Sequence, residues 1–150
     1  MAATIRRVTT DAERRQCYAV RFAVFVNEQR VPPDEEMDAL DDTATHYLVE
    51  DGGRIVGTAR LLDLGDRTCK IGRVALLPDC RGRGIGAELM RRVMADAVAR
   101  FDAIVLDAQV SVIPFYERLG FVAEGPVFLD AGIDHRRMTL RRPPEGRHSS

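Results

Sequence analysis

The sequence predicts a mixed α/β domain, in which helices pack on a mostly antiparallel, twisted sheet. Short runs of strand-forming residues alternate with helical periodicities in the order β-α-β-β-β-α-β-α-β-β. A Gly-Gly signal between two of the runs predicts a hairpin, and one later strand-helix-strand unit predicts a parallel pair. The 150 residues are enough for one domain of this kind.

The N-terminal elements are a strand and a helix. Ile5–Val8 is predicted as a short strand, and Thr10 with Glu13 forms a capping box that opens the helix. Pro32-Pro33 ends the helix. The i, i+4, i+7 spacing places Tyr18, Phe22 and Phe25 on one face of this helix.

An acidic stretch follows, and it predicts a short helix or none. Next come two strands, His46–Glu50 and Arg54–Leu62, around the hairpin turn Asp51-Gly52-Gly53. Cys69–Leu77 is a third strand of this meander. The acidic residues of the stretch are Asp34, Glu35, Glu36, Asp38, Asp41 and Asp42.

The second half of the chain opens with its strongest helix signal, Gly84–Phe101. Ala103–Leu106 is a continuously apolar strand, and Ser111–Leu119 is a helix that Gly120 ends. Phe121–Phe128 and His135–Leu140 then form a closing pair of strands. The apolar row of the long helix is Ile85, Leu89, Val93 and Ala97.

Composition excludes several classes of protein. With 22 basic and 23 acidic residues the net charge is −1, which disfavours a nucleic-acid binder. The longest apolar run, Phe22–Val26, is too short to span a membrane, and Met1–Arg7 holds no signal-peptide core. We therefore expect a cytoplasmic protein without a membrane partner.

The cysteines and histidines are scattered. Cys17, Cys69 and Cys80 indicate reduced thiols, and no Cys/His spacing resembles a metal site.

A glycine-rich loop between a strand and the long helix is the most informative feature. Its segment Arg81–Gly86 alternates arginine with glycine where a helix N-terminus offers unpaired N–H groups. This pattern predicts a phosphate cradle; the alternative is a tight connection with its arginines in solvent. A P-loop is excluded because Gly-Lys-Ser/Thr is absent. Gly82, Gly84 and Ala87 match a dinucleotide fingerprint, but four residues separate the strand from the first glycine.

The loop resembles the R/Q-x-x-G-x-G/A signature of the GNAT acetyltransferase superfamily. Arg73–Leu76 resembles the strand before that signature, and Ala108-Gln109 with Pro114–Phe121 resembles the family's late FYE-x-x-GF block. Arg21–Gln29, followed by the acidic stretch and His46, resembles the small bacterial ElaA/YjcF-type branch of the family.

This resemblance implies a fold of about seven strands and about four helices, with a V-shaped gap between the fourth and fifth strands. It implies one acyltransferase domain over residues 1–142. The polar segment 143–150, which starts with two prolines, is predicted to be a flexible tail. The reaction implied is acetyl-CoA-dependent N-acetylation of a small-molecule primary amine by direct transfer, without a metal. A homodimer is compatible with it, because dimers are common in the family.

The resemblance also assigns site residues. The backbone of the loop would bind the pyrophosphate, the strand before it would pair with the pantetheine arm, and an N–H near Val74 or Ala75 would stabilise the oxyanion. The residues expected to bind the donor are Val74, Ala75, Leu76, Arg81, Gly82, Arg83, Gly84, Ile85, Gly86, Gln109 and Tyr116.

Tyr116 matches the family's general acid, with a core tyrosine as the alternative. Some members carry a glutamate base where this chain has Gly72. Glu28 and His46 are the substitutes, unless water relays the proton; the alternatives are a solvated helix-end carboxylate and a sheet-edge histidine. Histidine's pKa suits a base near neutral pH.

The acidic stretch lies where the family builds its acceptor-side wall. A negative rim there would favour a cationic amine, although a solvated acidic face is the alternative. Two other functions stay open. The chain could be a non-catalytic acetyl-CoA-binding regulatory module. The segments Phe22–Asn27, Tyr47–Val49 and Gly57–Leu61, with the acidic stretch, also resemble acyl-homoserine-lactone synthases. Those enzymes use acyl-carrier protein and S-adenosylmethionine, whereas the loop Arg81–Gly86 favours coenzyme A.

Overall fold

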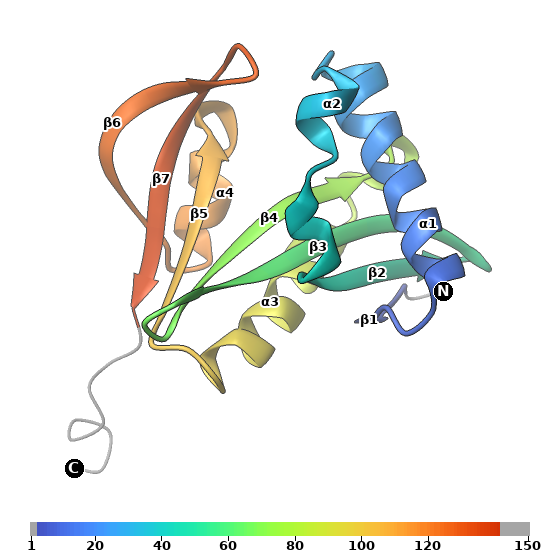
Figure 1. Ribbon diagram of the computed structural model, residues 1–150, viewed down its shortest axis with the longest axis horizontal. Coiled ribbons are helices and arrows are strands. Elements are labelled where there is room, and N and C mark those ends of the chain that lie inside the picture. The colour runs from blue at the N-terminus through green and yellow to red at the C-terminus, as the bar shows by residue number, and fades with distance from the viewer. Residues whose placement is uncertain (1–2, 142–150) are drawn as a thin grey trace. The chain divides into compact units, whose positions relative to one another are not determined.

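The computed structural model describes residues 3–141, and its elements follow the predicted order (Figure 1). The predicted tail at 143–150 lies outside the described residues. The strands are β1 (Thr4–Arg7), β2 (Thr45–Asp51), β3 (Arg54–Gly65), β4 (Thr68–Leu76), β5 (Ala103–Gln109), β6 (Val122–Asp130) and β7 (Ile133–Arg141). The α-helices are α1 (Asp11–Arg21), α2 (Pro33–Glu36), α3 (Ile85–Val98) and α4 (Ile113–Arg118). Shorter helical segments are the π-helix η1 (Phe22–Glu28) and the 3₁₀ turns η2 (Ala39–Asp42), η3 (Pro78–Cys80) and η4 (Val110–Val112).

The strands form a seven-stranded sheet in the order β1-β2-β3-β4-β5-β7-β6. The pairs β1–β2, β2–β3, β5–β7 and β6–β7 are antiparallel, whereas β4–β5 is parallel. The parallel pairing joins Thr68–Lys70 to Ala103–Val105 only. The predicted mixed, mostly antiparallel sheet is therefore confirmed, and the short parallel pairing agrees with the predicted gap between its fourth and fifth strands.

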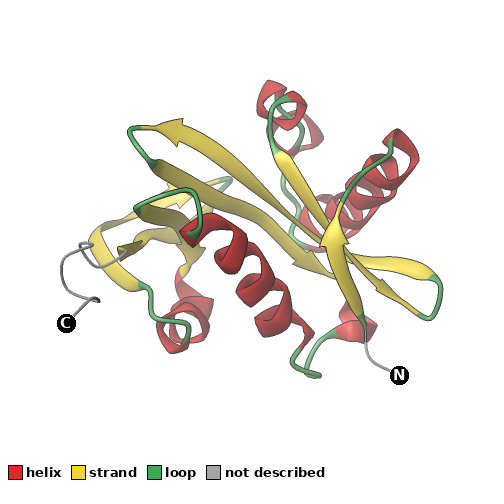
Figure 2. Ribbon diagram, turned by 90° about the horizontal axis from the view of Figure 1, so that it is seen from below, coloured by secondary structure: helices red, strands yellow, loops and turns green. Residues whose placement is uncertain are grey.

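The chain divides into two compact units. Among the described residues, unit 1 holds those up to Leu62 and Ile71–Val93, and unit 2 holds Asp63–Lys70 with those from Met94 onward. In unit 1, α1 lies on one face of the strands and the first turns of α3 lie on the other (Figure 2). The predicted apolar row of α3 is buried, since Ile85 is 4% exposed and Leu89 and Val93 are fully covered.

The start of α1 confirms the predicted cap. The Thr10 hydroxyl accepts a hydrogen bond from the Glu13 N–H at 3.1 Å, which satisfies one orphan donor of the helix. The Glu13 carboxylate reaches back one residue further than a capping box requires. Its Oε1 accepts from the Thr9 N–H at 2.9 Å, and its Oε2 binds Arg6.

The face that Tyr18, Phe22 and Phe25 share is not the buried face of the helix. Phe22 is 45% exposed, and Tyr18 and Phe25 are only half-buried. The charged side chain Arg21 is buried because carboxylates pair with it, a partnership that apolar periodicity does not detect. The π-helix from Phe22 onward also departs from the period of an α-helix. The side chains that α1 and η1 bury are Cys17, Val20, Arg21 and Val24.

Unit 2 is organised around β5, which pairs with β7 along its whole length. Asp107 on β5 accepts from Lys70 at 2.9 Å and from Arg137 at 2.6 Å. These contacts join β5 to its two neighbouring strands.

Two general features of the chain concern thiols and membranes. Cys17, Cys69 and Cys80 are buried free cysteines. No helix within residues 3–141 has the length and apolar character needed to cross a bilayer.

Candidate active site

The glycine-rich loop presents a row of backbone donors. Gly82 and Gly84 have φ values of 78° and 79°, a region that favours glycine. The helical ladder of α3 begins with the Glu88 N–H, which donates to the Gly84 carbonyl at 3.2 Å. Within the described part of the chain, the N–H groups of Gly82–Ala87 donate to no other group. Such donors at a helix N-terminus fit a phosphate or pyrophosphate.

Arg81 ties the start of this loop to the end of the π-helix. Its Nη1 and Nη2 each lie 2.7 Å from a carboxylate oxygen of Glu28, and its Nε donates to the Leu76 carbonyl at 3.0 Å. The hydrogen bond from Arg81 lowers the pKa of Glu28. The predicted base is thus an ion-paired carboxylate that braces the loop.

The second loop arginine is paired as well. Arg83 Nη1 lies 3.0 Å from Asp51 Oδ2 at the β2–β3 turn. Both guanidinium groups therefore bind carboxylates of unit 1, and the backbone N–H groups remain the loop's unpartnered donors.

The strand before the loop contains a backbone irregularity. Arg73 has a φ of 53°, which a side chain larger than hydrogen disfavours. Val74 and Leu76 are half-buried, whereas Ala75 is 4% exposed. Gly72 does not share the positive φ, and a Cβ placed on it would meet no heavy atom within 4 Å.

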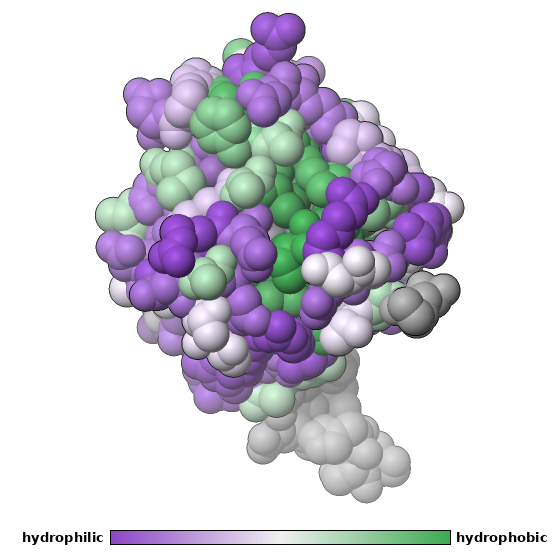
Figure 3. Space-filling model, turned by 90° about the vertical axis from the view of Figure 1, so that its right-hand side faces the viewer, coloured by the Kyte–Doolittle hydropathy of each residue, from purple (hydrophilic) through white to green (hydrophobic). Residues whose placement is uncertain are grey.

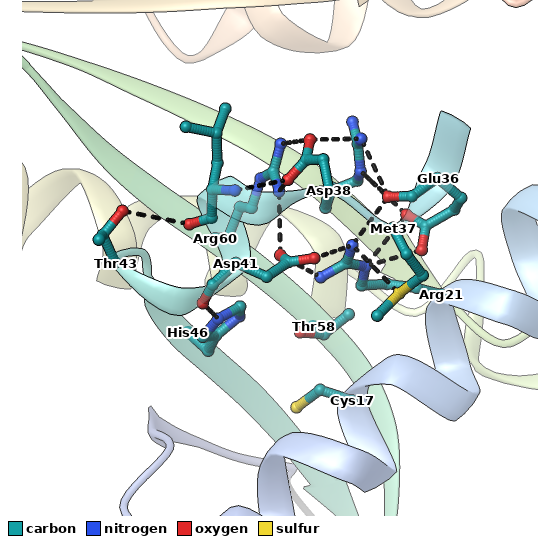
Figure 4. A network of polar contacts seen from close by, with 12 residues as sticks. Cys17, Arg21, Glu36, Met37, Asp38, Asp41, Thr43, His46, Thr58 and Arg60 are labelled. Atoms are coloured by element: carbon teal, nitrogen blue, oxygen red, sulfur yellow. Dashed lines mark hydrogen bonds and ion pairs between the residues drawn. The ribbon is translucent and has the colours of Figure 1, made fainter. Parts of the chain in front are cut away.

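A buried network of charges lies beside this strand, and sequence reasoning missed it (Figure 4). Arg21 at the end of α1 lies at its centre. The Arg21 Nη1 and Nη2 donate to both carboxylate oxygens of Asp41 at 2.8 and 3.0 Å, and its Nε donates to Glu36 at 3.0 Å. Arg21, Glu36 and Asp41 are each 3% exposed or less.

Two further arginines complete the network. Arg60 on β3 donates through Nη1 to Asp38 and Asp41, at 2.8 and 2.9 Å. Arg73 on β4 contacts Asp38 and Glu36, at 3.3 and 2.9 Å. Three arginines thus match three carboxylates of the acidic stretch. The predicted acidic rim is neutralised at Glu36, Asp38 and Asp41.

The rest of the acidic stretch is exposed but not uniformly acidic. Asp34, Glu35 and Asp42 are exposed, and so are the apolar side chains of Met37 and Leu40, which are 42% and 50% exposed. The exposed part of the stretch therefore combines charge with apolar area. On the side of the molecule at the right of Figure 1, hydrophobic side chains gather in a strip between polar ones (Figure 3).

His46, the other predicted base, lies inside unit 1. It is 5% exposed, and its Nε2 lies 2.9 Å from the Asp41 carbonyl. Because a carbonyl only accepts, Nε2 carries the proton. The other ring nitrogen, Nδ1, is buried without a partner among the described residues. Burial lowers the pKa of His46, so the ring is neutral at pH 7 but enclosed.

Tyr116 and Gln109 belong to unit 2. Tyr116 is half-buried on α4, between the rings of Phe115 and Phe121, whose centroids lie 5.0 and 6.2 Å away. Burial raises the pKa of Tyr116 to about 12. Its phenol therefore keeps its proton at neutral pH. Gln109 is the last residue of β5.

The structure brings some of the predicted site residues together. Glu28 contacts Arg81 directly, and Val74–Leu76 lead into the same loop within unit 1. His46 binds the Asp41 carbonyl and is shielded from solvent. Its ring centroid lies 5.8 Å from that of Tyr18, in a T-shaped arrangement. The buried arginines could have been suspected from Arg60, a charge inside the apolar run of β3.

Comparison with known proteins agrees with this architecture. The family model described as an acetyltransferase (GNAT) domain matches residues 8–142. The Bacillus subtilis protein named uncharacterized N-acetyltransferase YjcF is 35% identical over 130 residues, covering 85% of this chain and 92% of that protein.

Solved structures give the same result. Escherichia coli ElaA superposes with a TM-score of 0.82 at 25% identity, over 95% of this chain and 100% of that one. A GNAT family acetyltransferase from Elizabethkingia anophelis with acetyl-CoA bound shares the fold, with a TM-score of 0.71 at 17% identity over 93% and 97% of the two chains. The chain therefore belongs to the GNAT acetyltransferase family, in the small bacterial branch typified by YjcF and ElaA.

Proposed function

We propose that this protein is an acetyl-CoA-dependent N-acetyltransferase that moves an acetyl group directly to a primary amine of a small molecule. The observation that carries this proposal is the row of backbone N–H groups over Gly82–Ala87 that have no acceptor in the described chain. They fit the pyrophosphate of a coenzyme A donor. The acetyl-CoA bound to the Elizabethkingia protein of the same fold supports this choice of donor.

The donor supplies an acetyl thioester, and the residues of the chain have three tasks. The loop N–H groups bind the pyrophosphate. A backbone N–H at Val74 or Ala75 stabilises the negative charge that develops on the acetyl oxygen. Tyr116, whose pKa is about 12 and which is therefore protonated at pH 7, donates a proton to the leaving thiolate.

The amine must lose a proton before or during attack, and a water relay is the route that the residues favour. Gly72 has no carboxylate, Glu28 is held by Arg81, and His46 is enclosed. None of these three residues therefore provides a basic group that is both unpaired and exposed to solvent.

The first test is calorimetric titration of the protein with acetyl-CoA, followed by a panel of primary amines. One-to-one binding and acetylation of at least one amine are expected. A folded sample that binds no acetyl-CoA would overturn the proposal and shift attention to a carrier-protein donor or another phosphate ligand.

A second function, a non-catalytic acetyl-CoA-binding module, is favoured by the same finding that Glu28 is ion-paired and His46 is enclosed. The amine panel separates the two functions. Binding without transfer to any amine, and without hydrolysis of the thioester, would support the regulatory module instead.

A further inference from the structure

The most strained residue of the donor strand β4 is an arginine. Arg73 adopts a φ of 53° in the middle of a strand, directly before Val74. A left-handed residue in a strand turns the following peptide away from the regular ladder direction. The preceding residue is a glycine that does not take this conformation. The strained position is therefore occupied by arginine and not by glycine, and other contacts must hold the left-handed conformation of Arg73 in place.

The side chain of Arg73 supplies those contacts. Its Nε and Nη2 donate to the Glu36 carbonyl at 3.2 and 3.1 Å, and Nη2 also reaches the Glu35 carbonyl at 3.3 Å. Ion pairs to Glu36 and Asp38, at 2.9 and 3.3 Å, add to these bonds. One guanidinium thus binds two backbone carbonyls and two carboxylates of the α2–η2 segment.

The α2–η2 segment is itself fixed from two other elements. Arg21 of α1 binds Glu36 and Asp41, and Arg60 of β3 binds Asp38 and Asp41. Separating a buried guanidinium from its carboxylate strongly destabilises the folded state, so these ion pairs stay formed. Arg73 is therefore tied to a segment that is anchored elsewhere in unit 1.

We propose that Arg73 is a positioning residue: its tie to the α2–η2 segment holds the left-handed turn in β4 and so aims the Val74 and Ala75 N–H groups at the acetyl carbonyl of the donor. This inference rests on the proposed function and deepens it. It also links the acidic stretch to donor chemistry, because the stretch contributes the carbonyls and carboxylates that hold the strand.

The test uses three forms of the full chain: wild type, Arg73→Gly and Arg73→Lys. Glycine accepts the positive φ without strain but has no tie, whereas lysine keeps the charge but loses the planar fork. Backbone amide spectra are recorded by ¹H–¹⁵N NMR with and without acetyl-CoA, and with free CoA as the control that lacks the acetyl carbonyl.

In wild type, both acetyl-CoA and free CoA should shift the amide signals of Gly82–Gly86. Only acetyl-CoA should shift the amide signal of Val74 or Ala75 downfield. In Arg73→Gly the loop shifts should persist while the response at Val74 and Ala75 disappears. Acetyl-CoA affinity should then fall roughly fivefold, the usual value of one hydrogen bond, and CoA affinity should not change. Arg73→Lys should give an intermediate response.

The outcomes separate the two proposals. If the loop amide signals of the wild type shift with neither acetyl-CoA nor free CoA, the proposed function is overturned. A wild type that responds as expected, with an unchanged Val74 and Ala75 response in Arg73→Gly, overturns only the positioning role. If Arg73→Gly does not fold, the lysine variant decides: a full wild-type response in it also overturns the positioning role.

Discussion

Arg21 binds both carboxylate oxygens of Asp41, at 2.8 and 3.0 Å, with each residue 3% exposed or less. Arg60 adds a third bond to Asp41, at 2.9 Å. Guanidinium groups from α1 and β3 therefore meet on one buried carboxylate of η2. The acidic stretch is attached to the fold by charge, in a region where the exposed Met37 and Leu40 contribute little apolar burial.

We expect Asp41→Asn to lower the free energy of unfolding by about 3 kcal/mol, since the buried guanidinium groups of Arg21 and Arg60 each lose one of their two carboxylate partners. Urea unfolding followed by circular dichroism measures the change. Asp102→Asn is the matched control, because Asp102 pairs with Arg67 at 3.0 Å but both side chains are about 60% exposed. That variant should change stability by less than about 1 kcal/mol. Equal effects of the two substitutions would contradict the role given to the buried pair.

The Asp41 contribution should also depend on pH. Burial opposes ionisation of Asp41, but hydrogen bonds from Arg21 and Arg60 outweigh it and lower its pKa to about 2. The unfolded carboxyl therefore takes up its proton first as pH falls. The stability due to Asp41 is complete above about pH 4 and is lost between about pH 4 and 2.

His46 predicts a separate loss of stability at milder acidity. Burial lowers its pKa below 6.5, against the hydrogen bond to the Asp41 carbonyl and the Asp41 charge; Arg21 and Arg14 lower it further. The unfolded ring protonates first, so stability falls as pH drops below about 6.5. Urea unfolding at pH 7 and pH 5 should show a larger loss in wild type than in His46→Gln. A loss of the same size in His46→Gln would show that another group is responsible.

Gly84→Asp should abolish most acetyl-CoA binding while the fold is retained. The new carboxylate would place negative charge among the N–H donors that the proposed function assigns to a pyrophosphate, and affinity should fall at least ~10-fold, or about 1.4 kcal/mol. Gly65→Asp is the control, because its φ of 85° resembles the 79° of Gly84 and neither Cβ would meet a neighbour. Calorimetry with acetyl-CoA should therefore find normal binding in Gly65→Asp. Normal binding in Gly84→Asp would argue against the phosphate loop.

Tyr116→Phe should lower kcat about 10²-fold and leave the affinity for acetyl-CoA nearly unchanged, because only the proton donor is lost. Steady-state kinetics with any amine found active in the panel measure the effect. Phe115→Leu is a control for packing, since Phe115 contacts the Tyr116 ring. An unchanged kcat in Tyr116→Phe would mean that the tyrosine is structural.

Gly72→Glu should raise activity. The position has room for a side chain and no positive φ, so the carboxylate can be added at little cost to folding. It would restore a base where some family members carry one. The sign of the change in kcat at pH 7 checks this expectation, and Gly72→Gln, which has the same shape but no basic group, should not raise it.

The order of elements could be read from the sequence because it depends on local signals. The Thr10 cap, the Gly52-Gly53 turn and the apolar row of α3 act over a few residues, and the structure confirms each of them. The glycine loop could be placed for the same reason, since two glycines at positive φ follow a strand and precede a helix.

The charge network could not be read in that way. Arg21, Asp41 and Arg60 are 19 to 39 residues apart, and only the pairing of β2 with β3 and the packing of α1 bring them together. Apolar periodicity grouped Phe22 with Tyr18 and Phe25 on one face and did not indicate that Arg21 is the buried side chain. His46 was a candidate base for a similar reason. The sequence does not show that the η2 segment buries its ring or that the Asp41 carbonyl accepts a hydrogen bond from it.

The π-helix from Phe22 to Glu28 has a consequence for residue spacing. Its wider turns, in which the Gln29 N–H donates to the Val24 carbonyl at 3.0 Å, hold one more residue than an α-helix would over the same path. Deleting one residue, such as Ala23, would let the segment close as a regular helix. The path of the helix would then be unchanged, so that Glu28 would still face Arg81. The pairing of Glu28 with the loop would survive the loss of the extra residue, whereas a further deletion would rotate the side chains by about 100° and break it.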